Sequence, residues 1–186
     1  MAERREQAAA PDAVLTRIGQ VVMLHHGGDR EEARSRFLDL WAEIGQDGDP
    51  LHRCTLAHYL ADTQDDPADE LAWDLRALSA AEEAGETGRP REPGESGESE
   101  ESGEGTGVRG FLPSLHLNLA ADYVKLGRAE AARSHLRRAR SAADALADDG
   151  YGNGVRAAIG RLELRLGKDG GPAGGEQWGP PRPRPS

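Results

Sequence analysis

The segment Asn118–Ala139, NLAADYVKLGRAEAARSHLRRA, decides the fold. Its first half places Leu119, Tyr123 and Leu126 at spacings of four and three residues, which brings them onto one face of a helix. Gly127 then interrupts the pattern, and an alanine-rich run with the same helical period follows it. The segment therefore predicts two helices joined by a tight turn.

The same helical period recurs along most of the chain, and no stretch shows sustained alternation of β-branched and polar residues. Several periodic stretches begin with a helix-start signal. Asp49 stands directly before Pro50, Asp29 is followed by Glu32 in capping-box spacing, and Pro113 is expected to open a helix. About seven helices are expected, beginning near residues 12, 29, 50, 67, 113, 129 and 152. Their mostly short connections predict an antiparallel array.

Residues that break helices recur at regular distances. Gly28, Pro67, Gly127 and Gly167 are separated by 39, 60 and 40 residues. The middle interval exceeds the others by roughly the length of the glutamate-rich segment 85–107, GETGRPREPGESGESEESGEGTG. Without that insertion, a unit of about 40 residues repeats three and a half times, which is typical of stacked helical hairpins.

The opening segment resembles a tetratricopeptide repeat (TPR). The family's small, aromatic and leucine positions are filled in order by Leu119, Ala120, Tyr123, Leu126, Gly127, Ala132, Leu136 and Ala139. The first unit keeps Ala33 and Phe37 at the corresponding places, and the second keeps Ala72. The spacing is longer than the family's usual 34 residues. The resemblance covers roughly residues 13–167 and is clearest over 112–146.

The resemblance implies an all-α, antiparallel helical-hairpin repeat array, a TPR-like α-solenoid. The residues expected to pack its layers are Ala33, Phe37, Ala72, Leu119, Ala120, Tyr123, Gly127, Ala132, Leu136 and Ala139. Small side chains among them let helices approach closely, and the large ones fill the space between layers.

One domain with a long insertion is expected. Residues 13–84 form the first two hairpins, and residues 111–167 form the third hairpin and a terminal helix. The N-terminal residues 1–12, the acidic Gly/Glu/Ser-rich insertion 85–110 and the Pro/Gly-rich tail 168–186 are expected to be disordered. The insertion and the tail contain almost no large apolar side chain, Trp178 excepted, and cannot offset the entropy of ordering their backbone.

Composition excludes several classes of function. The net charge is −10, which argues against a nucleic-acid groove, because such a groove needs a basic stripe. The single cysteine, Cys54, excludes an internal disulfide and a cysteine-based zinc site. No apolar run is long enough for a signal peptide or a membrane span. A cytoplasmic protein without cofactor, nucleic-acid or membrane partner is expected.

Histidines and carboxylates raise the question of catalysis. His25, His52, His58 and the group around Asp65 lie close together in the sequence, but no metal-ligand spacing appears among them. Asp65 and its acidic neighbours are interpreted as helix caps. No catalytic, cofactor-binding or metal-binding residue is therefore predicted, and the protein is expected not to be an enzyme. Two alternatives stay open: a metal-dependent or carboxylate-based enzyme using this set, and a helical regulatory module for a separate DNA-binding partner.

The TPR resemblance implies a protein-interaction scaffold whose first helices line a concave groove for a partner. That groove is expected to carry Leu15, Ile18, Val22, His25, Cys54, Ala57, Ala61, Gln64, Leu117, Ala121, Val124, Ala157, Arg161 and Leu164. The set is mostly apolar, so an amphipathic helix, an apolar peptide or a second copy of the chain is the expected occupant. The lysine and asparagine clamp of some family members is absent, with Asn118 one position away from its place.

Overall fold

The computed structural model describes residues 13–87 and 104–169. These residues form seven helices: α2 (Ala13–His26), α3 (Arg30–Ile44), α4 (Pro50–Asp62), α5 (Pro67–Thr87), α6 (Glu104–Lys125), α7 (Ala129–Ala143) and α8 (Gly150–Asp169). No strand occurs in the described ranges, so the predicted all-α fold is confirmed. The predicted disordered segments lie largely outside the described residues.

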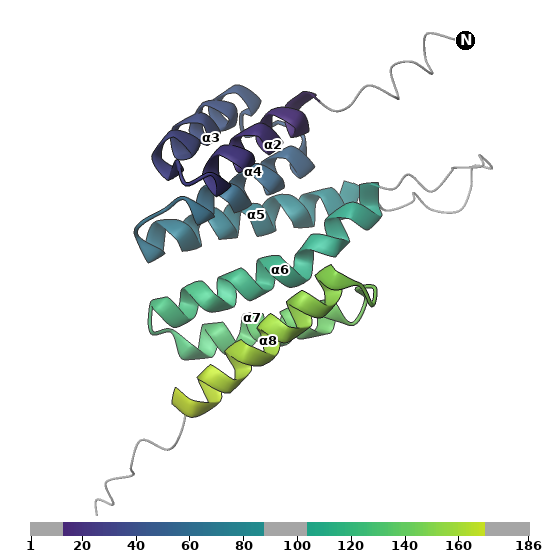
Figure 1. The fold of residues 1–186 in the computed structure, drawn as a ribbon. Coiled ribbons are helices and arrows are strands. Elements are labelled where there is room, and N and C mark those ends of the chain that lie inside the picture. The colour runs from purple at the N-terminus through teal and green to yellow at the C-terminus, as the bar shows by residue number, and fades with distance from the viewer. Residues whose placement is uncertain (1–12, 88–103, 170–186) are drawn as a thin grey trace, which may run out of the picture.

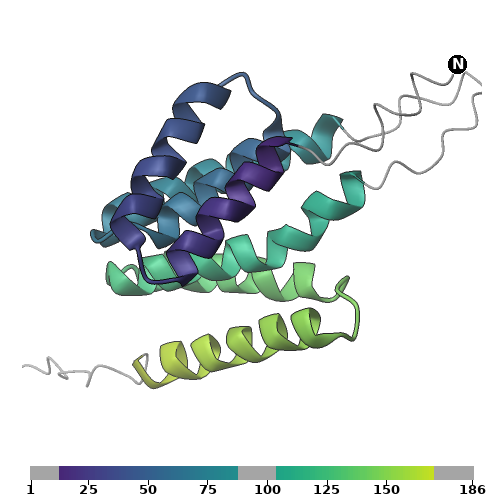
Figure 2. The same cartoon turned by 45° about the horizontal axis from the view of Figure 1, so that its top comes forward.

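Consecutive helices run antiparallel and stack in chain order, from α2 and α3 at one end to α8 at the other (Figure 1). Each helix packs on the one before it, and the pairs α4–α5 and α6–α7 are the most extensive. The insertion interrupts the chain between α5 and α6. These two helices nevertheless pack against each other and join the first four helices to the last three (Figure 2).

The first and third hairpins turn in the same way. Gly28 and Gly127 both have positive φ, 98° and 69°, a conformation that favours glycine. In each turn the residue after the glycine donates its N–H to a carbonyl five residues back, as in a Schellman motif: Asp29 to Leu24 at 3.3 Å and Arg128 to Tyr123 at 2.8 Å. The two hairpins thus share one turn geometry at the positions that the repeat register aligns.

Small residues dominate the buried helix contacts. Cys54, Ala57, Ala77, Ala80 and Ala81 are all buried in one cluster between α4, α5 and α6. A second cluster joins α6, α7 and α8 through Ala120, Ala132, Leu136, Ala139, Ala143, Val155, Ile159 and Leu166. Side chains this short let helix backbones come close together, and the remaining space is filled by leucines and isoleucines.

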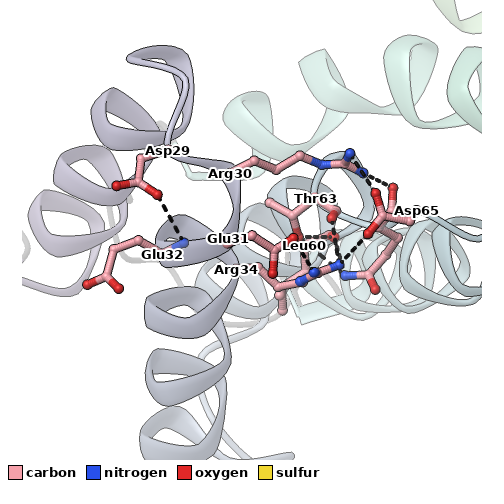
Figure 3. Close-up of polar contacts among 9 residues, drawn as sticks. Asp29, Arg30, Glu31, Glu32, Arg34, Leu60, Thr63 and Asp65 are labelled. Atoms are coloured by element: carbon pink, nitrogen blue, oxygen red, sulfur yellow. Dashed lines mark hydrogen bonds and ion pairs between the residues drawn. The ribbon is translucent and has the colours of Figure 1, made fainter.

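Hydrogen bonds and ion pairs connect the start of α3 to the turn between α4 and α5 (Figure 3). Arg30 and Arg34 both form ion pairs with Asp65, at 2.8 and 3.0 Å. Arg30 also donates to the carbonyl of Gln64, and Arg34 donates to the carbonyl of Thr63 at 3.2 Å. The two arginines satisfy carbonyls at the end of α4 that have no partner within the helix. The contact fixes how the second hairpin is placed against the first.

Three sequence expectations need correction. Pro113 does not open a helix but lies buried inside α6, which begins at Glu104. A proline inside a helix lacks the N–H for the preceding turn and bends the helix, and the first turns of α6 run at an angle to the rest (Figures 1 and 2). Helices also enter the insertion range 85–110 from both sides, up to Thr87 and from Glu104. Gly167, expected at a turn, lies inside α8, which ends at Asp169.

Replacing Ala120 with leucine is expected to destabilise the fold by about 1–3 kcal/mol, because Ala120 is fully buried where α6 meets its neighbours and has no room for three more carbons. Chemical denaturation followed by circular dichroism measures the change. The adjacent substitution Ala121→Leu is the control, since Ala121 is only half-buried. Equal losses in both variants would contradict the packing described here.

Candidate functional site

The interface between α5 and α6 contains two aspartates that are almost fully buried. Asp74 and Asp122 are each 1% exposed, and the charge of Asp74 acts on the carboxyl group of Asp122. Leu71, Leu78 and Leu119 line the same interface. Burial and the neighbouring charge of Asp74 both disfavour the ionised form of Asp122, so they favour a proton on that carboxyl group.

The pKa of Asp122 is raised to about 8. Burial is the largest cause, and the carboxyl groups of Asp74 and Glu70 raise it further, while Lys125 opposes them. Lys125 Nζ lies 2.6 Å from Glu70 Oε1 and 3.4 Å from Asp122 Oδ1, and so connects the buried pair to the surface. Within the described part of the chain, Asp74 Oδ1 and Asp122 Oδ2 have no hydrogen-bond partner.

His58 of α4 reaches the same pair from the surface. Its Nδ1 lies 3.7 Å from Asp74 Oδ1 and 3.3 Å from Asn118 Nδ2. Burial lowers the pKa of His58, but the neighbouring carboxylates of Asp74 and Asp62 outweigh it and raise the pKa above its ordinary value. The protonated ring points a donor at Asp74, whereas the neutral ring can accept from the amide of Asn118. The protonation of His58 therefore decides which of its two neighbours it binds.

One stripe of α6 consists of side chains that are exposed or half-buried. Phe111, Ser114, Asn118, Ala121 and Lys125 follow one another at spacings of three and four, which places them on one side of the helix. Phe111 is 41% exposed, Lys125 is exposed, and the other three are half-buried.

This stripe is flanked by side chains from the neighbouring helices. His58 of α4 meets Asn118, and the hydroxyl of Tyr151 at the start of α8 lies 2.8 Å from Ser114 Oγ and donates to the carbonyl of Gly110 at 3.1 Å. We call the resulting surface the inner face; it consists of His58, Phe111, Ser114, Asn118, Ala121, Lys125 and Tyr151. Phe111 and Tyr151 supply apolar surface at one end of it, and Asn118 and Lys125 supply polar groups towards the other.

The predicted groove residues divide into three sets. Ile18, Cys54, Ala57 and Ala61 are buried in the core and are not available to a partner. Leu15, Val22, Leu117 and Val124 are half-buried and pack against core clusters. His25, Gln64 and Ala121 are half-buried, whereas Ala157, Arg161 and Leu164 are exposed on α8. The structure thus brings Ala121 to the inner face and places most of the other predicted residues between helices.

The predicted packing residues lie mainly in the core. Ala33, Phe37, Leu119, Ala120, Ala132, Leu136 and Ala139 are buried. Ala72 and Tyr123 are half-buried, and Gly127 forms the exposed turn. Tyr123 stacks on His135 of α7, with ring centroids 5.4 Å apart.

The residues of the enzyme alternative do not share one cluster. His52 Nδ1 lies 4.0 Å from Asp49 at the start of α4, whereas Asp65 is held by Arg30 and Arg34. His58 faces Asp74 instead. Among the described residues, no group of three or more histidine, cysteine, aspartate or glutamate side chains could hold a metal ion.

Comparison with protein-family models, with curated proteins and with solved structures finds no match for this chain. The class of protein that its geometry defines is an all-α stack of antiparallel helical hairpins. None of the helices in residues 13–87 and 104–169 has the length and apolar character needed to cross a membrane.

Asp122→Asn is expected to make stability less dependent on pH. The folded protein keeps a proton on Asp122 up to a pKa of about 8, while the unfolded chain releases it near the ordinary value of 3.8. Stability from this group therefore falls as pH rises between those two values. An asparagine cannot ionise, so the variant should be more stable than the parent at pH 8.5 by about 1–3 kcal/mol.

Urea denaturation from pH 5 to pH 9 measures this difference, which should shrink towards pH 5. The control is Asp69→Asn at an exposed position of α5. If the free energy of unfolding changes with pH in the same way for the parent and for Asp122→Asn, then Asp122 does not keep its proton in the folded protein.

Cys54 is expected to be unreactive in the folded protein. Burial, and secondarily the charge of Asp74, raises the pKa of its thiol to about 12, so almost no thiolate is present at neutral pH. A maleimide reagent at pH 7.5 should label Cys54 only as fast as the protein unfolds. Rapid labelling without denaturant, measured by intact mass, would contradict this burial.

Proposed function

We propose that the protein is a non-enzymatic, TPR-like interaction scaffold that binds a peptide or helix of a protein partner on the inner face. The observation that carries the proposal is the stripe of α6 described above. It presents accessible side chains at helical spacing and is flanked by His58 and Tyr151 from two other helices. A surface assembled from several helices of a hairpin stack is the kind of site with which helical repeat proteins hold extended ligands.

The turn geometry and the small-residue packing support the repeat interpretation. The shared turns at Gly28 and Gly127, together with the buried Ala33 and Ala132 five residues after them, are what a repeated hairpin unit would produce. The interval between these turns corresponds to two units of about 40 residues once the insertion is set aside. We also propose a cytoplasmic location, because Cys54 is a buried free thiol.

The inner face suits a ligand that has both polar and apolar groups, rather than the apolar ligand expected from the sequence. Phe111 and the ring of Tyr151 supply apolar surface at one end. Asn118 and Lys125 supply donors at the other, with the charge of Lys125 partly balanced by Glu70. A peptide with an apolar side chain followed by backbone carbonyls or a carboxylate would satisfy both ends. The alternative of a regulatory module for a DNA-binding partner uses the same face and differs only in the partner.

Ala121→Arg is expected to abolish binding of peptides selected on the parent protein, because it places a long charged side chain in the middle of the inner face. Peptides are selected from a displayed random library, and their affinities are measured by fluorescence anisotropy. Asn118→Ala removes one side-chain hydrogen-bonding group and should weaken binding about tenfold.

Ser35→Arg is the control, because it adds the same side chain at an exposed position of α3. Circular dichroism must show that all three variants remain folded. Selected peptides that bind the Ala121→Arg variant as tightly as the parent would refute the inner face as the binding site.

A further inference from the structure

A groove lies between α7 and α8, at the end of the stack. Its volume is about 290 Å³, and it is lined by Arg133, Leu136, Arg137, Glu163, Leu166 and Gly167. Leu136 and Leu166 are 4% and 5% exposed and belong to the core cluster of these helices. Arg133 and Arg137 are one turn apart on α7. The groove is thus apolar at its base and cationic along one edge, and it is separate from the inner face.

We propose that the C-terminal segment of this chain, residues 170–186, folds back over this groove and places Trp178 in it. The described chain ends at Asp169, only two residues beyond Gly167, so this segment starts at the groove itself. Trp178 is the only large apolar residue in GGPAGGEQWGPPRPRPS. It stands nine positions after Asp169, and a glycine-rich linker of that length spans about 15–18 Å on average, enough to return along the last turns of α8.

The chemistry of the groove suits an indole ring. The aliphatic side chains of Leu136 and Leu166 offer an apolar base for the ring, and the two guanidinium groups can lie against its face. The chain forms this pairing elsewhere, where the guanidinium of Arg76 lies 4.6 Å from the centre of the Trp73 ring. Apart from the residues next to Gly167 and the nearby backbone of α8 itself, no described atom comes within 4 Å of the place where a Cβ on Gly167 would lie, which leaves room for the ring.

Charge supports the same placement. Arg133 is paired with Glu130, and Arg140 with Glu163, but Arg137 has no ion-pair partner among the described residues. In the C-terminal segment, Glu176 stands two residues before Trp178. A carboxylate at that position can reach Arg137 when the indole lies on the leucines.

The acidic insertion is the competing occupant within this chain, and its attachment points are less suitable. It joins α5 to α6, whose Gly110 contacts Tyr151 at the beginning of α8. The groove lies near the other end of α8, beside Leu166 and Gly167. The C-terminal segment starts within one turn of the groove, whereas the insertion would have to extend along most of α8.

Fluorine NMR of the full chain labelled with 5-fluorotryptophan tests the proposal. The chain has three tryptophans, and Trp178→Phe identifies the resonance of Trp178. In the parent, this resonance should differ from that of a labelled peptide of residues 170–186 and should be protected from solvent. Gly167→Phe fills the groove and should return the resonance to the free-peptide position. Arg137→Ala should shift it partway, whereas Arg138→Ala, at an exposed neighbour outside the groove, should leave it unchanged.

A chain truncated after Asp169 should bind the same peptide added separately, and Arg137→Ala should weaken that binding about threefold to tenfold. A Trp178 resonance at the free-peptide position in the parent would overturn the proposal. So would a shift that depends on protein concentration, which would indicate a second copy as occupant. A shift that responds to deletion of residues 88–103 would assign the groove to the insertion instead. If Gly167→Phe fails to fold by circular dichroism, Arg137→Ala against Arg138→Ala still decides the outcome.

Discussion

The packing of α5 on α6 is the constraint on which the rest of the molecule depends. It joins the first four helices to the last three across the insertion, and it contains the buried pair of Asp74 and Asp122. The leucines of this interface supply most of its stabilising energy, because apolar burial is worth roughly 25 cal/mol per Å². The acid pair adds an electrostatic constraint, because Asp122 is buried beside Asp74 and its pKa is raised to about 8.

The same interface couples the inner face to the interior. His58 lies between Asn118, which a ligand can reach, and Asp74, which it cannot. The amide of Asn118 can donate only to the neutral ring of His58. A ligand that binds this amide removes that hydrogen bond and so favours the protonated ring, which donates to Asp74. By linkage, a lower pH would favour such a ligand by the same free energy. The protonation of His58 therefore links the inner face to the buried carboxyl group of Asp74.

Helix positions were predictable from the sequence because they follow from local rules. Asp49 before Pro50 starts α4, and Gly127 ends the first helix of the third hairpin, as expected. The expectation that Pro113 opens a helix was wrong. Proline is favoured at helix starts, whereas here long-range burial of its ring keeps it within α6.

The inner face was not predicted, because a shift of one residue along a helix turns the predicted stripe by 100°, which exchanges Leu117 for Asn118. The raised pKa of Asp122 could not be predicted, since Asp74 lies 48 positions earlier in the sequence and only tertiary packing brings the two side chains together.

The three hairpins reach the same arrangement by different means. The first and third turn through a glycine at positive φ, and the second turn has none, because Thr63 and Gln64 bond back to Leu60 and Ala61 instead. That turn exposes the carbonyls that Arg30 and Arg34 bind, so the second hairpin is tied to the first by charge as well as by packing. On its other side the second hairpin meets the third through the titratable interface. The central hairpin thus meets the first hairpin through ion pairs and the third through the buried acid pair, and its packing on α6 places the inner face that α6 carries.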